Sequence, residues 1–307
     1  MDSYGEARCL KRSTLIEALA SDLPPNTVRL SCQVNAIKLD PLTSDPVVYL
    51  EDGTLIKAKV VIGCDGLNSV VASFLELKFN YNYSTSLVRG LTYYEKGHGM
   101  DDFVILYKDP TRLGRIPIDE NLVYWFVVQN RNPQDPLYMK DQKLMQQSAL
   151  ESIKDFPREA VEIIEKADLD SFHYACLGYR VPWDLLFKRH YKGGVTVAGD
   201  AMHAMAPFMG QGGAASIEDA VVLARCAAPT IQMLRANQKE GKKMLELAFH
   251  QYEKERKMRV TLLCLQTYLI GLLIKTSSSL GKFVTILLMI ILFRDPDKLS
   301  LYDCGRL

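Results

Sequence analysis

The sequence lacks an excess of charge of either sign. Its 307 residues contain 37 Lys and Arg against 36 Asp and Glu, which gives a formal net charge of +1. A general nucleic-acid-binding protein needs surplus cations to neutralise phosphates, so we expect no nucleic-acid partner. Apolar residues make up 48% of the chain and charged residues 24%, which is typical of a folded globular protein and excludes wholesale disorder.

Paired metal-binding motifs are also missing. The seven cysteines are scattered and odd in number, and they contain no C-x-x-C pair, so neither a disulfide framework nor a zinc site is expected. The five histidines form no H-E-x-x-H cluster, and no G-x-S-x-G elbow is found, which disfavours a metalloenzyme and an α/β-hydrolase. The cysteine usage predicts an intracellular, reducing compartment: the cytoplasm first, with a plastid or a membrane surface as alternatives.

No apolar run reaches the roughly 20 residues that a membrane span requires. The N-terminus has no basic-then-apolar segment of the kind that marks a secretory signal. Residues 262–274 and 283–293 are apolar stretches, and we interpret them as packed C-terminal helices. The preceding helix, 239–259, is rich in Lys and Arg, so a contact between the C-terminal helices and a membrane surface stays open as the alternative.

The order of patterns along the chain predicts a mixed α/β fold, α+β overall. A helix is expected at 6–20, and a short, wholly apolar strand at 58–62 is of the buried type. From about 84 to 130 the strands become rich in Val, Tyr and Trp, which indicates an inserted antiparallel sheet. A polar helix is expected after it, at about 140–167. We therefore divide the chain into the following parts: a ligand-binding domain at 1–76, an inserted substrate-binding sheet domain at 77–182, the second part of the first domain at 183–235, and C-terminal helices at 236–307.

Two segments join a buried strand to a turn that carries glycine and aspartate. The first contains Asp65 and Gly66; the second runs from Gly199 and Asp200 through Pro207 to the string Gly210-Gln211-Gly212-Gly213. Ligands of open α/β sheets lie at the carboxyl ends of the strands, where a carboxylate can accept a sugar hydroxyl. The glycines would present bare amides to an anionic group at the start of a helix expected at 214–228. Glu218 and Asp219 are expected near the start of that helix, where they would complement its dipole. His203, inside the second segment, is expected to be packed and hydrogen-bonded. The alternatives are a plain turn for the first segment and a capped helix start for the second.

Together these strings resemble the class A flavoprotein monooxygenases of the p-hydroxybenzoate hydroxylase type, most closely their plant monooxygenase-1-like and zeaxanthin-epoxidase-like branch. The resemblance covers roughly residues 5–260 and implies an FAD-binding, Rossmann-like domain. It places Asp200 on the FAD sugar hydroxyls, Asp65 near the pyrophosphate, and an arginine-bearing helix beside the cofactor. The FAD contacts that it implies are Arg8, Arg12, Val34, Asp65, Gly66, Gly199, Asp200, Pro207, Gly210, Gln211, Gly212 and Gly213.

The resemblance also implies an activity. Such enzymes use NAD(P)H and O₂ to hydroxylate or epoxidise a small hydrophobic or aromatic molecule. The cofactor carries the chemistry, so no catalytic side chain is expected from this chain. Trp125 and Phe208 are our candidates for lining the substrate. The choice between NADH and NADPH, the substrate and the oligomeric state stay open.

One departure from the family pattern bears on that activity. Its members begin with a strand and a G-x-G-x-x-G turn, and here nothing of that kind precedes Met1-Asp2-Ser3. We therefore expect a partial FAD-binding domain whose first βαβ unit is missing, in an N-terminally truncated chain. The alternative function is a catalytically incompetent isoform that retains FAD poorly and acts only through protein contacts.

Overall fold

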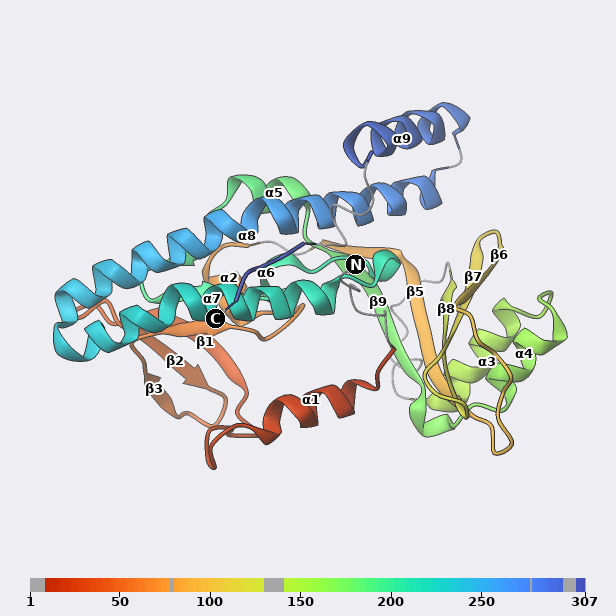
Figure 1. Ribbon diagram of the computed structural model, residues 1–307, viewed down its shortest axis with the longest axis horizontal. Coiled ribbons are helices and arrows are strands. Elements are labelled where there is room, and N and C mark those ends of the chain that lie inside the picture. The colour runs from red at the N-terminus through yellow and green to blue at the C-terminus, as the bar shows by residue number, and fades with distance from the viewer. Residues whose placement is uncertain (1–8, 78–79, 130–140, 277, 295–301, 307) are drawn as a thin grey trace. The chain divides into compact units, whose positions relative to one another are not determined.

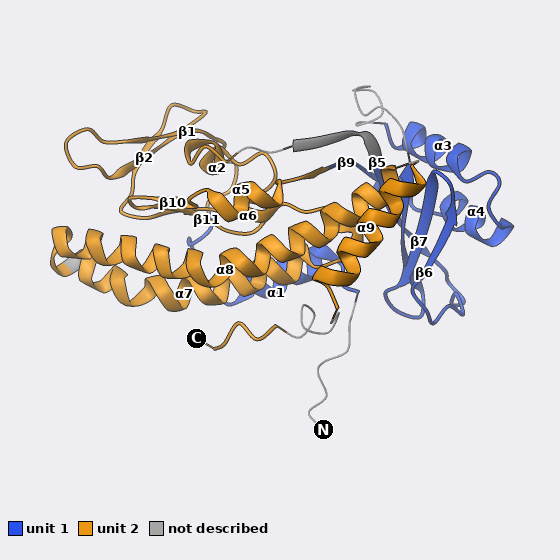
Figure 2. Ribbon diagram, turned by 90° about the horizontal axis from the view of Figure 1, so that it is seen from above, with its two compact units in different colours: residues 1–28, 81–177 blue, residues 29–80, 178–307 orange. Residues whose placement is uncertain are grey.

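The computed structural model describes residues 9–77, 80–129, 141–276, 278–294 and 302–306, and its helices and strands are labelled in Figure 1. The chain forms two compact units (Figure 2): unit 1 is Met1–Val28 with Tyr81–Leu177, and unit 2 is Arg29–Asn80 with Gly178–Leu307. The mixture of helix and sheet confirms the predicted fold class. Residues 1–28, which the sequence placed with the ligand-binding domain, group with the inserted sheet.

Unit 1 is built on a five-stranded sheet in the order β6-β7-β8-β5-β9. Antiparallel pairing joins β5 to β8, β8 to β7, and β7 to β6, as the alternating Val- and Tyr-rich segments predicted. The strands have these bounds: β5 Asn80–Tyr93, β6 Val104–Lys108, β7 Thr111–Pro117, β8 Leu122–Gln129 and β9 His173–Tyr179.

The helices of unit 1 differ from the predictions in two places. The expected helix at 6–20 is α1, Arg12–Ser21, and the polar helix expected at 140–167 is two helices, α3 (Gln142–Ser152) and α4 (Arg158–Glu165). Pro157 precedes α4, and its ring cannot continue a helix from the N-terminal side. A 3₁₀ turn, η1, at Leu169–Ser171 leads into β9. One core joins the sheet to α3 and α4.

Unit 2 contains two three-stranded sheets. The first has the order β1-β2-β3 and is antiparallel; the second has the order β10-β11-β4, in which β11 and β4 run parallel. The strands have these bounds: β1 Val34–Leu39, β2 Pro46–Leu50, β3 Leu55–Lys57, β4 Val61–Gly63, β10 Tyr191–Lys192 and β11 Val195–Val197. The strand expected at 58–62 is β4, shifted by a few residues. The prediction that it is buried was wrong, since Ile62 is exposed and only Gly63 is buried.

Two long helices, α7 and α8, run along each other beside these sheets (Figures 1 and 2). The predicted end of α7 at 228 was wrong, because the helix continues past Pro229 along α8. The helices and 3₁₀ turns of unit 2 have these bounds: α2 Val70–Phe74, α5 Pro182–Phe187, α6 Asp200–His203, η2 Pro207–Met209, α7 Gly212–Ala236, α8 Gln238–Lys275 and α9 Ser279–Leu292.

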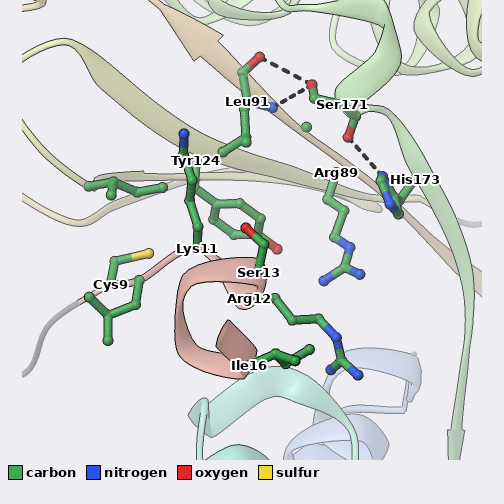
Figure 3. A pocket seen from close by; sticks show the side chains of 13 residues that line it. Cys9, Lys11, Arg12, Ser13, Ile16, Arg89, Leu91, Tyr124, Ser171 and His173 are labelled. Carbon is green, nitrogen blue, oxygen red and sulfur yellow. Dashed lines mark hydrogen bonds between the residues drawn. The ribbon is translucent and has the colours of Figure 1, made fainter. Parts of the chain in front are cut away.

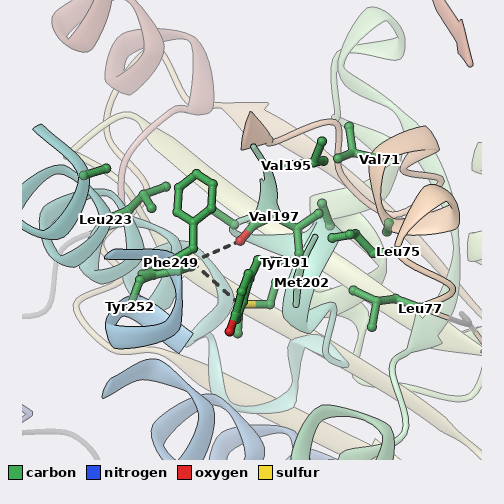
Figure 4. Close-up of a cluster of buried hydrophobic side chains, with 14 of the residues drawn as sticks. Val71, Leu75, Leu77, Tyr191, Val195, Val197, Met202, Leu223, Phe249 and Tyr252 are labelled. Atoms are coloured by element: carbon green, nitrogen blue, oxygen red, sulfur yellow. Dashed lines mark hydrogen bonds between the residues drawn. The ribbon is translucent and has the colours of Figure 1, made fainter. Parts of the chain in front are cut away.

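The core of unit 2 fixes the strand that carries the second glycine–aspartate motif. Side chains of β11, α2, α7 and α8 meet in one buried cluster (Figure 4). Val195 and Val197 are fully buried, and the hydroxyl of Tyr252 on α8 donates a hydrogen bond of 3.2 Å to the carbonyl of Val197. This bond satisfies a backbone group at the end of the strand, where pairing stops. The turn after β11 therefore starts from a rigid base.

Candidate functional site

Parallel pairing brings the two glycine–aspartate turns together. In the register of the second sheet, Val195 lies opposite Val61, and Val197 lies opposite Gly63. The amide of Ala198 donates to the carbonyl of Gly63 at 2.9 Å, one residue beyond the last strand position. The segments that follow β4 and β11 both leave the sheet at the carboxyl ends of the strands, where α/β proteins bind ligands.

The first turn uses its aspartate to hold α2. The Ser69 hydroxyl donates to one Asp65 carboxylate oxygen at 2.5 Å, and the Val70 amide donates to the other at 2.8 Å. A carboxylate at this position satisfies amides at a helix N-terminus. Gly66, at φ 76°, faces open space, since a Cβ built there would meet no atom within 4 Å. The structure thus gives Asp65 a capping role; a direct contact between Asp65 and FAD stays a prediction.

The second turn leaves its aspartate exposed. Gly199 adopts φ 61° and ψ −146°, a conformation that residues with a Cβ avoid, and this bend directs the chain into α6. Asp200 is the first residue of α6 and is exposed. Among the described residues, no hydrogen bond to the Asp200 carboxylate is found. This carboxylate is therefore able to accept hydroxyl donors from a ligand.

Beyond α6 the chain forms an uncapped helix start. Pro207 opens η2, and Gly210, at φ 62°, ends it. Gln211 occupies the N-cap of α7 but makes no capping hydrogen bond with its side chain. A Cβ added at Gly210 or Gly213 would meet nothing within 4 Å. The first amides of this 25-residue helix thus face open space at its positive end, an arrangement that suits an anionic group.

A buried network of hydrogen bonds and ion pairs, which the sequence patterns did not predict, holds the second turn in place. Asp219 on α7 is fully buried; one of its oxygens accepts from the Gly199 amide at 2.8 Å and from His203 Nε2 at 2.6 Å. The other oxygen accepts from Arg256 Nε at 2.7 Å. Burial by itself would raise the pKa of Asp219, but His203, Arg256 and the Gly199 amide together lower it. Asp219 is therefore a buried anion whose donors hold Gly199 in place.

We expected Glu218 and Asp219 near the start of their helix, where they would complement its dipole. That placement was wrong: α7 begins at Gly212, so both residues lie about two turns inside it. Glu218 instead pairs with Arg256 at 2.7 Å and with Arg259 at 2.9 Å. A signal in the sequence could have predicted the network: two adjacent acids fall among the apolar residues of α7, and two arginines fall among those of α8. The expected packed, hydrogen-bonded role of His203 agrees with its burial and its bond to Asp219.

The other predicted site residues are scattered. Arg8 lies outside the described residues. Arg12, at the start of α1, belongs to unit 1 and lines a pocket there, and Val34 begins β1 and packs against the core of unit 2. The FAD contacts of Arg12 and Val34 stay predictions. Phe208, in η2, is half-buried and stays a candidate for lining the substrate.

Trp125 does not line a substrate site, and that prediction is corrected. Its side chain is fully buried in the core of unit 1. The indole packs edge-on against the ring of Phe172, with 5.0 Å between centroids, and Nε1 donates to the hydroxyl of Thr92 at 3.0 Å. An alternating strand places every second residue in the core, and Trp125 falls on the inward side of β8.

A pocket of about 590 Å³ opens in unit 1 between α1 and the sheet (Figure 3). Leu91, Ile118 and Ile16 give it apolar walls. Arg89 of β5 extends its guanidinium into the same space (Figure 3), near the hydroxyl of Tyr124. Burial raises the pKa of Tyr124, while the charge and hydrogen bond of Arg89 act in the opposite direction. Among the described residues, no carboxylate lies within ion-pair distance of Arg89.

The geometry of unit 2 defines a class of protein. Three features suit a cofactor that contains phosphate and sugar groups. They are the uncapped start of a long helix, the open space over three glycines, and an exposed carboxylate after a parallel strand. Gly66, Gly210, Gly213 and Asp200 are the residues of this chain that would hold it. The arrangement thus suits a nucleotide cofactor.

Comparison with known proteins identifies the cofactor and the family. The family model of an FAD binding domain matches residues 11–267. Monooxygenase 1 of Arabidopsis thaliana is 40% identical over 308 residues, covering 98% of this chain and 77% of the relative. Monooxygenase 2 of the same plant is 38% identical and covers 98% of this chain and 75% of the relative. The chain belongs to the class A FAD-dependent monooxygenases, as the motifs predicted.

Solved structures show the same fold. The HpxO protein of Klebsiella pneumoniae, in complex with FAD and uric acid, superposes with a TM-score of 0.75 at 18% identity, covering 96% of this chain and 73% of HpxO. A salicylate hydroxylase in a substrate complex superposes with a TM-score of 0.68 at 19% identity, with the same coverage of both chains.

Proposed function

We propose that this protein uses NAD(P)H and O₂ to hydroxylate or epoxidise a small aromatic or hydrophobic molecule that carries an acidic group. FAD, when bound, supplies the redox chemistry and the activation of O₂. The observation that carries the choice of substrate is the pocket of unit 1, whose walls are largely apolar and whose lining includes the cations Arg89, Arg12 and Lys11. None of the three has an ion-pair partner among the described residues.

The pocket matches such a molecule in size and in chemistry. A volume of about 590 Å³ is within the range of small-molecule sites. Leu91 and Ile118 would contact a ring, and Arg89 would bind a carboxylate or another anionic oxygen through two parallel hydrogen bonds. A half-buried cation without a carboxylate partner is costly, and an anionic ligand removes that cost. The solved relatives bound to uric acid and described as a salicylate hydroxylase substrate complex support this class of ligand.

The polar groups of the pocket support orientation rather than acid–base catalysis. His173 Nδ1 donates to the carbonyl of Ser171 at 2.9 Å, which leaves Nε2 as the free ring atom. Burial raises the pKa of Tyr124, so its hydroxyl is neutral at physiological pH and can donate a hydrogen bond. The chain's own residues therefore bind the substrate, orient it and exclude water from it.

The test is NAD(P)H oxidation by the FAD-loaded protein with matched pairs of probes. Salicylate and uric acid test an anionic group, and salicylamide is the neutral analogue of salicylate. We expect faster oxidation of NADH or NADPH with the anionic probe than with its amide. Arg89→Gln should raise KM for the anion about tenfold or more, because charge-assisted hydrogen bonds contribute roughly 1.5–3 kcal/mol. FAD absorbance should stay unchanged.

Arg158→Gln is the matched control, since Arg158 is exposed on α4 of the same unit and pairs with Glu165. Equal KM values for Arg89→Gln and the unsubstituted protein would show that Arg89 and its pocket do not bind the anionic group of the substrate. A protein that retains FAD but oxidises neither NADH nor NADPH with any probe would contradict the proposed reaction itself.

A further inference from the structure

We propose that α9 inserts into the surface of a lipid bilayer that contains anionic headgroups. The helix has 14 residues, SLGKFVTILLMIIL, and its apolar side chains are exposed although they would be expected in a core. The exposed set comprises nine residues: Leu280, Phe283, Val284, Ile286, Leu287, Leu288, Ile290, Ile291 and Leu292. An exposed apolar patch of this kind marks a surface that another phase or molecule covers.

The distribution of these side chains favours lipid over a protein partner. At 100° per residue, the nine exposed positions span about 240° of the helix circumference. The remaining face contains Thr285, which is buried, and it packs on the end of α8 (Figure 1). A flat protein surface covers one side of a helix, whereas lipid tails surround whatever part of it is inserted. The contact with α8 takes the place of the polar face that interfacial helices usually have.

The length of α9 sets the mode of insertion. Fourteen residues rise about 21 Å, less than the roughly 30 Å of a hydrocarbon core, so α9 cannot span a bilayer. By length and composition α8 could span one, but 44% of its apolar window is buried. Its cations Arg256 and Arg259 pair with acids of α7 inside unit 2. The structure therefore assigns α8 to the protein core and α9 to the membrane interface.

The positive charge around α9 favours a lipid surface with anionic headgroups. From Arg256 to Arg294 the sequence contains no Asp or Glu. Three cations near α9 are exposed, and none of them forms an ion pair with a described residue. Lys275 is the last residue of α8, Lys282 lies near the start of α9, and Arg294 follows its end. Cations beside an inserted apolar helix add electrostatic attraction to acidic headgroups. The same cations would repel one another if two copies of this chain met through α9.

Vesicle flotation tests the proposal with the full chain. We expect it to float with vesicles of phosphatidylcholine plus phosphatidylglycerol, and to float less with phosphatidylcholine alone or in high salt. The triple variant Phe283→Gln, Ile286→Gln and Ile290→Gln should bind at least about tenfold more weakly, because three apolar side chains are lost from the inserted arc. Gln is a good helix former, so the helix itself should persist.

The matched control changes three apolar residues that are exposed elsewhere in unit 2: Leu42→Gln, Leu55→Gln and Ile56→Gln. It should bind vesicles like the unsubstituted chain. Lys275→Gln with Lys282→Gln should remove the preference for phosphatidylglycerol while leaving some binding to neutral vesicles. If the α9 triple variant fails to fold, Phe283→Trp provides an independent readout, since its added fluorescence should shift to the blue with anionic vesicles.

Three results would overturn the proposal. One is the absence of vesicle binding with no fluorescence shift in Phe283→Trp. Another is equal binding by the α9 triple variant and the control. The third is self-association of the unsubstituted chain that the α9 triple variant abolishes, without vesicle binding by either; that result would assign α9 to a contact between copies.

Discussion

The turns after β4 and β11 begin at neighbouring positions of one sheet, yet they use their aspartates in opposite ways. Asp65 accepts hydrogen bonds from Ser69 and Val70 and holds α2, while Asp200 is exposed and accepts none from the described residues. The second turn is held instead by Asp219, a buried carboxylate from α7. Where a separate buried anion fixes the backbone, the aspartate of the motif stays available for a ligand. The difference separates carboxylates that hold the fold from one that no described residue binds by a hydrogen bond.

The largest expected effect comes from removing the partner of the buried carboxylate. Arg256→Met leaves Asp219 without its arginine partner, and breaking a buried pair in this way costs about 3–5 kcal/mol. We expect the free energy of unfolding, measured in urea, to fall by that amount, with loss of FAD binding. Arg225→Met, which removes a partly exposed pair with Glu255, should cost clearly less, because surface ion pairs contribute little to stability. Similar losses in both variants would contradict the special role of the network.

Acid should destabilise the fold through a structural carboxylate of α8, Glu253. Burial alone would raise the pKa of Glu253, but hydrogen bonds from the His190 ring and amide and the charge of Lys257 lower it to about 2. Because the folded pKa lies below the ordinary value of 4.5, the stabilisation is complete above pH 4.5 and is lost as the pH falls toward 2. Glu253→Gln should flatten this part of the pH profile of unfolding, by on the order of 2 kcal/mol.

The control for the acid prediction is Glu255→Gln, at a more exposed position of the same helix. The stability of this variant between about pH 5 and pH 2 should follow that of the unsubstituted protein. If the free energy of unfolding of Glu253→Gln falls as steeply with pH as that of the unsubstituted protein, Glu253 does not stabilise the fold.

Asp200→Asn should separate binding from stability. We expect FAD to dissociate about tenfold to a hundredfold more readily, because a hydrogen bond to a charged group contributes roughly 1.5–3 kcal/mol. The melting temperature of the FAD-free protein should stay nearly unchanged, since no described residue forms a hydrogen bond or an ion pair with the Asp200 carboxylate. Fluorescence titration with FAD and thermal unfolding measure the two effects. A lower melting temperature in the FAD-free variant would show that Asp200 is structural after all.

Asp65→Ala should show the opposite pattern, with a smaller effect. Loss of the α2 cap should lower the free energy of unfolding of the FAD-free protein by about 1 kcal/mol. FAD affinity should fall less than in Asp200→Asn, because the Asp65 carboxylate, although exposed, already accepts hydrogen bonds from Ser69 and Val70, whereas Asp200 accepts none from the described residues. If FAD affinity falls more in Asp65→Ala than in Asp200→Asn, the contrast between the two turns is wrong.

Much of the fold was predictable because its signals are local. Alternating Val and Tyr predicted the antiparallel strands β5 to β8, and the apolar strand before Gly199 predicted β11. The inward side of β8 was harder to predict, because alternation places residues on two faces without telling which face is buried. Trp125 was therefore assigned to a substrate site when it belongs to the core.

The sequence by itself determined the family, the cofactor and the two turns that would hold it, because glycine and aspartate after a buried strand are a local pattern with a local physical cause. Only the tertiary structure decided how each carboxylate is used. Asp219, His203 and Arg256 lie on three different helices, and their hydrogen bonds depend on how α7 and α8 pack. The exposure of α9 is likewise a property of packing, since an apolar helix reads the same in the sequence whether protein or another phase covers it.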